Sequence, residues 1–180
     1  MDGLDELNGL LRGAGSHIAV RQLSVRDELE IQQVFQACND YFQIVDGRDA
    51  RETEASEFLG PVPVANKQED RFSLGLVDRR AKLIGLLDGL DGYPAASVSW
   101  IGLFMIVPQD RGQGIGRQFM QCWERFRKAQ SVAEIRLGVV DENAAALRFW
   151  ESQGYAALTR TEPRIFGNKI QVVNVLHKVL

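Results

Sequence analysis

The chain has 180 residues, of which 45% are hydrophobic and 25% charged, a composition typical of one packed domain and not of a disordered or disulfide-framework chain. Its 21 lysines and arginines stand against 24 aspartates and glutamates, a net charge of −3, so no basic field favours nucleic acid and no such partner is expected. The start is acidic, and no apolar run approaches the roughly 18 residues of a membrane span. We therefore expect a cytoplasmic protein without membrane contact.

The two cysteines are isolated in the sequence. Cys38 and Cys122 have no cysteine or histidine neighbour at metal-ligand spacing, which argues against a zinc site or a redox pair. Free cysteines rank among the most buried residue types. We therefore expect two small core residues in a reducing compartment and no metal site.

The N-terminal third predicts two elements and one polar excursion. Residues 1–16 carry four glycines and no sustained periodicity, so we expect a loosely ordered lead with room for one helical turn at 7–11. Order is expected from residue 17, with a short strand and then an amphipathic helix from Asp27 to about Phe42. Residues 46–70 are polar and acidic, with a short helix ending near 58–60 before Pro61 and Pro63, and they suggest a flexible lid or binding loop.

Strands and helices alternate through the rest of the chain, which predicts a single α/β domain over residues 17–180. A strand, helix, strand unit from 98 to 139 implies a right-handed crossover between parallel strands, and the continuous apolar run at 101–107 suits a central strand. The expected elements are strands at 72–76 and 82–88, a strand at 98–107, a helix at 115–130, a strand at 135–139, a helix at 141–153, and a final hairpin of strands at 155–165 and 169–179.

The segment 107–117 carries the clearest chemical signal. It follows an apolar strand and opens an amphipathic helix, where free backbone N–H groups and the helix dipole favour an anion. Three alternate glycines remove the side chains that would hold a phosphate away from those amides. The alternative, that these glycines only make a tight strand-to-helix turn, stays open on this segment alone.

Two common nucleotide motifs do not fit this segment. A P-loop requires Gly-Lys-Ser/Thr, whereas Gly116 is followed by Arg117 and a glutamine. A dinucleotide fingerprint requires glycine where Arg117 stands, and the acidic ribose ligand is not in its expected place. The segment therefore predicts a phosphate ligand of another kind.

Two motifs in order resemble the GNAT superfamily of N-acetyltransferases. The sequence Arg111-x-x-Gly114-x-Gly116, after the apolar run 104–108, is similar to the acyl-CoA signature Q/R-x-x-G-x-G/A. Residues 143–155 are similar to the family helix N-x-x-A-x-x-F-Y-x-x-x-G-F/Y. The resemblance is close over 100–156. It implies the GNAT-type acyl-CoA N-acyltransferase fold, an α/β fold with a central mixed sheet of about seven strands flanked by about four helices.

The resemblance also implies acetyl-CoA as co-substrate and catalysis without a metal. The CoA diphosphate would lie on the loop amides, and the pantetheine arm would pair like an extra strand with the preceding strand, which the family splays from its neighbour. The residues assigned to acetyl-CoA are Phe104, Met105, Ile106, Arg111, Gly112, Gln113, Gly114, Ile115, Gly116, Arg117, Asn143 and Trp150.

Groups for the proton transfers are less clearly marked. An alkyl amine with a pKa near ~10.4 is protonated at pH 7, so a base must remove a proton before attack. Asp88 and Asp91 are the candidates, although Asp-Gly turn chemistry explains both without a function. Many relatives protonate the departing thiolate with a tyrosine. The matching position here is Trp150, whose indole N–H is no proton source at neutral pH and which also fits a packed aromatic.

The acceptor is expected to be a small primary amine. The candidates for its binding are Asp40, Tyr41, Asp88 and Tyr93. Residues 40–57 hold six acids against two arginines, which would attract a cation, and residues 111–128 hold five basic residues against one acid, which would suit phosphates.

Three functions are therefore compatible with the sequence. The first is an acyl-CoA-dependent N-acetyltransferase in which the amine attacks the thioester directly in a ternary complex. The second is a catalytically silent acyl-CoA-binding regulatory protein, for which Trp150 is the best argument. The third is a plain α/β interaction domain, which requires both motifs to be accidental. The final hairpin also suggests a possible homodimer.

Overall fold

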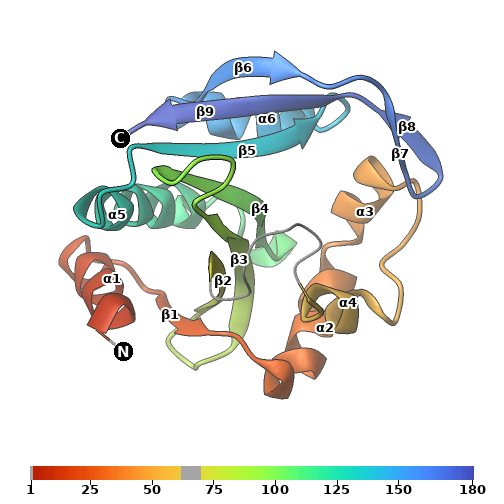
Figure 1. Ribbon diagram of the computed structural model, residues 1–180. Coiled ribbons are helices and arrows are strands. Elements are labelled where there is room, and N and C mark those ends of the chain that lie inside the picture. The colour runs from red at the N-terminus through yellow and green to blue at the C-terminus, as the bar shows by residue number, and fades with distance from the viewer. Residues whose placement is uncertain (1, 62–69) are drawn as a thin grey trace.

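A computed structural model describes residues 2–61 and 70–180 (Figure 1). Its centre is a seven-stranded mixed sheet with strand order β1-β2-β3-β4-β5-β9-β6, and a separate two-stranded sheet is formed by β7 and β8. This is the α/β architecture that the sequence predicts. The strands are β1 (Ala19–Gln22), β2 (Arg71–Val77), β3 (Leu83–Asp91), β4 (Val98–Ile106), β5 (Glu134–Val140), β6 (Ala156–Arg160), β7 (Arg164–Phe166), β8 (Lys169–Gln171) and β9 (Val173–Val179).

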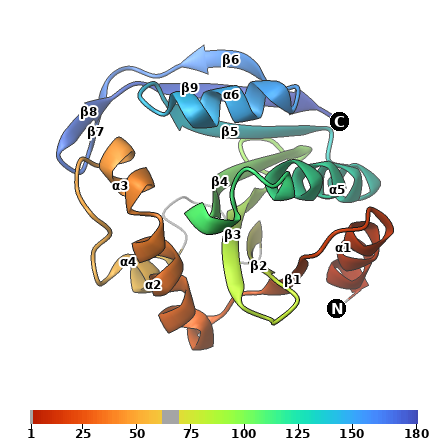
Figure 2. The ribbon, with the colours of Figure 1, turned by 180° about the vertical axis from the view of Figure 1, so that it is seen from behind.

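Helices cover both faces of the sheet. Seen from behind, α5 and α6 lie over one face, while α2, α3 and α4 lie at the side of β3 and β4 (Figure 2). The apolar stripe of α5 places Phe119 and Trp123 against the sheet, nearly fully buried. The helices are α1 (Asp2–Gly13), α2 (Glu28–Ala37), α3 (Asn39–Val45), α4 (Glu54–Phe58), α5 (Ile115–Ala129) and α6 (Ala144–Ser152).

The centre of the sheet is split along part of its length. The strands β4 and β5 pair in parallel, as predicted, but only from Val98 opposite Glu134 to Ile101 opposite Leu137. On its other side β4 stays paired with β3 to Ile106, with a register shift that skips Gly102. Beyond Ile101 the edge of β4 that faces β5 is therefore open.

The expectation of a loosely ordered lead over 1–16 is wrong for the residues that the structure describes. Residues 2–13 form α1, which packs beside α5, with Gly3 facing the ring of Phe126. Leu7 and Leu11, one helical turn apart, have no exposed surface. Burial of this pair outweighs the poor helix propensity of the glycines.

The expected helix over 27–42 is two helices. Cys38 breaks it with a ψ of 31°, so α3 starts in a new direction. The end of α3 is held by the hairpin of β7 and β8: Gln171 donates to the carbonyl of Ile44 at 2.8 Å, and the Asn168 N–H donates to that of Asp46 at 2.7 Å. The hairpin thus satisfies carbonyl groups that a helix end leaves unpaired.

The described part of the expected lid, residues 46–61, is held by ion pairs. Arg48 binds both Asp46 and Glu54, and Arg51 binds Glu54 and Glu57. The short helix predicted to end near 58–60 is α4. The remainder of that segment, with Pro63, lies outside the described residues. Within residues 2–61 and 70–180, no helix is both long and apolar enough to cross a bilayer.

Candidate active site

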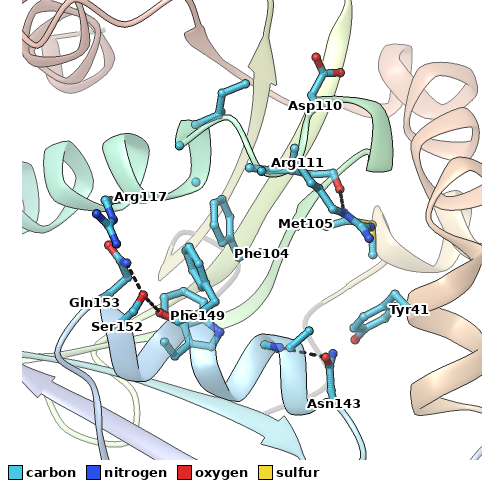
Figure 3. A pocket seen from close by; sticks show the side chains of 18 of the residues that line it. Tyr41, Phe104, Met105, Asp110, Arg111, Arg117, Asn143, Phe149, Ser152 and Gln153 are labelled. Atoms are coloured by element: carbon cyan, nitrogen blue, oxygen red, sulfur yellow. Dashed lines mark hydrogen bonds between the residues drawn. The ribbon is translucent and has the colours of Figure 1, made fainter.

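A cavity of about 580 Å³ opens where β4 and β5 separate (Figure 3). Its walls come from α3, the open half of β4, the loop before α5 and the exposed face of α6. Eleven of the twelve residues predicted to bind acetyl-CoA line it; Gln113 does not. The complete lining is Asp40, Tyr41, Ile44, Phe104, Met105, Ile106, Asp110, Arg111, Gly112, Gly114, Ile115, Gly116, Arg117, Asn143, Ala145, Ala146, Phe149, Trp150, Ser152 and Gln153.

The loop before α5 forms a cradle of backbone amides. Gly112 and Gly114 have φ values of +74° and +80°, in a backbone region that residues with a Cβ rarely adopt. This geometry leads the chain directly into α5. The first N–H groups of α5 have no carbonyl partner within the helix. Arg117 adds an exposed cation in the first turn. Together they make an anion site with a net positive field.

Aromatic side chains form the floor of the cavity behind β4. Phe104 stacks on Phe119 at a centroid distance of 5.5 Å and also contacts Phe149 and Trp150. Trp150 is only 5% exposed and meets Tyr155 edge-on at 4.9 Å. Trp150 is therefore a packed aromatic residue, one of the two roles that the sequence left open, and it also borders the cavity.

The helix α6 turns one face to the cavity. Asn143 caps it, because its Oδ1 accepts the Ala146 N–H at 3.1 Å. The cap explains Asn143 structurally and leaves its amide nitrogen beside the cavity. Ala146, Phe149 and Gln153 follow at helical spacing on the same face.

The helix α3 closes the opposite side. Figure 3 shows Tyr41 reaching into the cavity from this helix. Burial raises the pKa of the Tyr41 hydroxyl to about 12, so the phenol stays protonated. Next to it, hydrogen bonding from Arg111 holds the pKa of the Asp40 carboxyl below its ordinary value. Both acceptor candidates on this helix therefore lie at the cavity.

Asp88 does not line the cavity, but it lies close to the point where the strands separate. Its Oδ1 accepts hydrogen bonds from Arg71 Nε at 2.8 Å and Ser73 Oγ at 2.5 Å. Its Oδ2 lies 3.9 Å from the position that a Cβ on Gly102 would occupy, and it has no hydrogen-bond partner among the described residues. Burial raises the pKa of the Asp88 carboxyl above its ordinary value.

The structure does not bring Asp91 or Tyr93 to the cavity. Asp91 accepts from Ser99 Oγ at 2.8 Å and pairs with Arg127, a buried residue of α5, at the end of β4 that is still paired with β5. Tyr93 meets the ring of Trp100 edge-on at 5.7 Å. Asp91 therefore has a structural role, because it neutralises a buried arginine.

The two charged segments serve the cavity less than their totals suggested. Three of the six acids of 40–57, Asp46, Glu54 and Glu57, bind the arginines of the same segment, and Asp40 binds Arg111. In the basic segment 111–128, only Arg111 and Arg117 line the cavity. The charge counted along the sequence overstated the field at the cavity, because of the six acids only Asp40 lines it and Arg111 binds that residue.

The family follows from a comparison with sequence models. The model described as "Acetyltransferase (GNAT) family" matches residues 31–155, which include the amide cradle, the open edge of β4 and α6. The chain belongs to the GNAT acetyltransferase family. Members of the GNAT family are acyl-CoA-dependent N-acetyltransferases, and the chain is assigned to this enzyme class.

Solved structures share the GNAT fold with this chain. An acetyltransferase from Thermus thermophilus superposes with a TM-score of 0.75 at 21% identity, covering 91% of this chain and 97% of its own. Spermidine N-acetyltransferase from Vibrio cholerae, in complex with CoA and spermine, gives 0.70 at 16% identity, with 91% and 95% covered. Ribosomal-protein-S5-alanine acetyltransferase from Vibrio fischeri gives 0.69 at 15% identity, with 91% and 93% covered. No curated protein matches the sequence.

Several GNAT cavity residues were not singled out from the sequence. Phe149, Ser152 and Gln153 belong to the α6 motif, and their helical spacing from Asn143 was a usable signal. Ile44 had no such signal in the sequence, because its position at the cavity depends on the break between α2 and α3 at Cys38. Among the described residues, no group of three or more histidines, cysteines and acids is placed to hold a metal ion.

Proposed function

We propose that this GNAT protein transfers an acetyl group from acetyl-CoA to a primary amine by direct attack in a ternary complex. The observation that carries the proposal is the cavity itself. It joins an amide cradle at a helix N-terminus to an unpaired strand edge, and Asp88, outside the cavity lining, lies opposite Leu103 of that strand. These three features match a phosphorylated, extended thioester and a base for the amine.

The amides of 112–117 and the Arg117 side chain would hold the CoA diphosphate. The pantetheine arm is an extended chain with two amides, so its groups match the open edge of β4 beyond Ile101. Asn143 offers its side-chain nitrogen from the opposite wall. With the arm in this place, the thioester would lie near Gly102, where the strands part.

Asp88 is our candidate for the base. A buried carboxylate with one oxygen fixed by Arg71 and Ser73 presents the other in a defined direction, here toward Gly102. It would take a proton from the ammonium group, and the amine nitrogen would then attack the thioester carbon to give a tetrahedral oxyanion. Collapse of this intermediate would break the C–S bond, and the remaining surplus proton on nitrogen would pass to the departing CoA thiolate. A backbone N–H near Ile106 would stabilise the oxyanion.

The acceptor is proposed to be a slender alkyl amine. Asp88 is enclosed by β2, β3 and the end of α4. An ammonium group can therefore reach it only at the end of a narrow alkyl chain. The solved neighbours include enzymes named for spermidine and for a ribosomal protein, so both small and protein amines occur within the fold. The acidic segment does not support the choice, because Asp40 alone of its acids lines the cavity and Arg111 binds it.

A turnover assay tests this function. Purified protein is incubated with acetyl-CoA and a panel containing spermidine, lysine, alkyl monoamines and an alanine-terminated peptide, and thiol release is followed together with the mass of each amine. We expect thiol release that depends on one class of amine, with one acetyl group gained by that amine. Tight CoA binding without thiol release across the panel would support the silent acyl-CoA-binding protein, the alternative that Trp150 favours.

A further inference from the structure

The Arg111 side chain turns away from the amide cradle. Its Nε donates to the carbonyl of Ile106 at 2.6 Å, and its two terminal nitrogens bind both carboxylate oxygens of Asp40. One of them also lies 3.5 Å from the Cys38 sulfur. We name this set of contacts the Arg111 bridge.

The bridge leaves Arg111 little capacity for a phosphate. A guanidinium carries five N–H donors, and the bridge contains four contacts from them. The backbone N–H of Arg111 is also used, because it donates to the Pro108 carbonyl at 3.2 Å. The Arg117 side chain, by contrast, has no hydrogen bond or ion pair with another described residue, and Figure 3 shows it on the other side of the cavity.

The bridge joins three parts of the molecule that are distant in sequence. Cys38 is the break between α2 and α3, and its thiol also reaches the Ile106 carbonyl at 3.7 Å. Asp40 lies in the first turn of α3, directly before Tyr41. Ile106 is the last residue of β4, next to the loop. Arg111 therefore ties the start of the helix that carries Tyr41 to the end of the open strand.

We propose that Arg111 is a positioning residue in this site. It fixes α3, and with it Tyr41, against the open end of β4, and the CoA diphosphate is held by the amides of 112–117 and by Arg117. This inference rests on the proposed function for the identity of the ligand. It assigns different tasks to the two arginines of the loop, which the sequence pattern treats alike.

The first test compares CoA dissociation constants by calorimetry. Arg111→Gln and Asp40→Asn should each change the constant by less than about twofold, whereas Arg117→Gln should weaken binding by about tenfold, the equivalent of one charge-assisted hydrogen bond. Arg125→Gln, an exposed arginine of the same helix that does not line the cavity, is the matched control. If Arg111→Gln weakened CoA binding as much as Arg117→Gln does, the proposal would be overturned.

The second test measures hydrogen exchange of the amides of 39–45 without any ligand. Arg111→Gln and Asp40→Asn should both speed exchange in this segment and leave β5 and β9 unchanged. Arg111→Lys, which can keep one contact with Asp40, should give an intermediate rate. Unchanged exchange in α3 in both variants would contradict the positioning role. A wild-type protein that binds no CoA would overturn the proposed function instead, and this exchange measurement would still decide the role of the bridge.

Discussion

The parallel pairing of β4 with β5 ends where Ile101 lies opposite Leu137, although β4 continues to Ile106 and β5 to Val140. Both strands are stable beyond this point because each keeps its other neighbour, β3 or β9. The separation exposes backbone groups in the middle of a sheet, where they are normally paired. An extended ligand that carries amides can pair with these groups.

Gly116→Leu should block the cavity. A Cβ at Gly116 would already lie 3.3 Å from the Phe149 ring and 3.4 Å from Ile106 Cδ1, so a longer side chain must occupy ligand space. We expect CoA affinity to fall at least about tenfold, with a cost of about 1 to 2 kcal/mol in the free energy of unfolding. Gly13→Ala, where a Cβ meets nothing within 4 Å, is the control. Calorimetry and urea unfolding give the two quantities.

Asp88→Asn should remove the acidic limb of the pH–rate profile. Burial raises the pKa of Asp88 above its ordinary value, so the acidic limb should lie at a higher pH than an ordinary aspartate would give, and kcat/KM should rise as Asp88 loses its proton. The asparagine can still accept from Arg71 and Ser73, but the largely buried Arg71 guanidinium loses its charged partner, so the unfolding free energy should fall by about 2 kcal/mol and rates are compared per folded molecule. We expect a rate loss of about a hundredfold or more. A variant that kept both the rate and the limb would rule out Asp88 as the base.

Asp91→Asn is the matched change three residues further on, and it should affect folding alone. The buried Arg127 guanidinium loses its charged partner, which should cost about 2 kcal/mol of unfolding free energy. The rate per folded molecule should stay within about twofold, since Asp91 lies opposite Ser99, at the paired end of β4, and does not line the cavity. A hundredfold loss of turnover in folded Asp91→Asn protein would contradict this assignment.

Trp150→Phe should leave most of the activity in place. The ring packs against Phe104, Phe149 and Tyr155, and phenylalanine preserves much of that contact. Because an indole N–H does not release its proton near neutral pH, we expect kcat to fall by no more than about fivefold. Steady-state kinetics decide the point, and a loss above a hundredfold would show that the indole N–H takes part in the reaction.

Leu11→Ala should show that α1 belongs to the folded domain. The side chain has no exposed surface, so its truncation should cost about 3 kcal/mol. Glu6→Ala, an exposed position on the same helix, should cost less than about 0.5 kcal/mol. Equal midpoints in urea for the two variants would mean that α1 contributes nothing to the core.

The parts of the site with a local signature were predictable from the sequence. Gly114 and Gly116 define the turn into α5 by spacing alone, and the helix from Asn143 repeats every three to four residues. Asp88 and Asp91 could also have been separated, because positions three apart in a strand point to opposite faces. The Asp-Gly pair suggested a turn there, whereas β3 runs on to Asp91 with a register shift.

Other features depend on contacts between residues that are far apart in the sequence, which no local pattern predicts. Gly3 and Gly9 argue against a helix at the start of the chain, yet Leu7 and Leu11 fold it by burial against the rest of the domain. The pairing of Arg111 with Asp40, 71 positions apart, requires the break at Cys38 that redirects α3. The ion pairs of Arg48 and Arg51 likewise fix Asp46, Glu54 and Glu57 within their own segment, which a count of charges cannot show.

Hydrogen exchange with and without saturating CoA locates the CoA site. Binding in the gap between β4 and β5 should slow exchange in two separate segments, the strand residues 102–106 and the loop residues 112–117, while α1 and β6 keep their rates. Protection that misses both segments, or that appears instead around Arg125 and Lys178 at the other end of α5, would contradict the account.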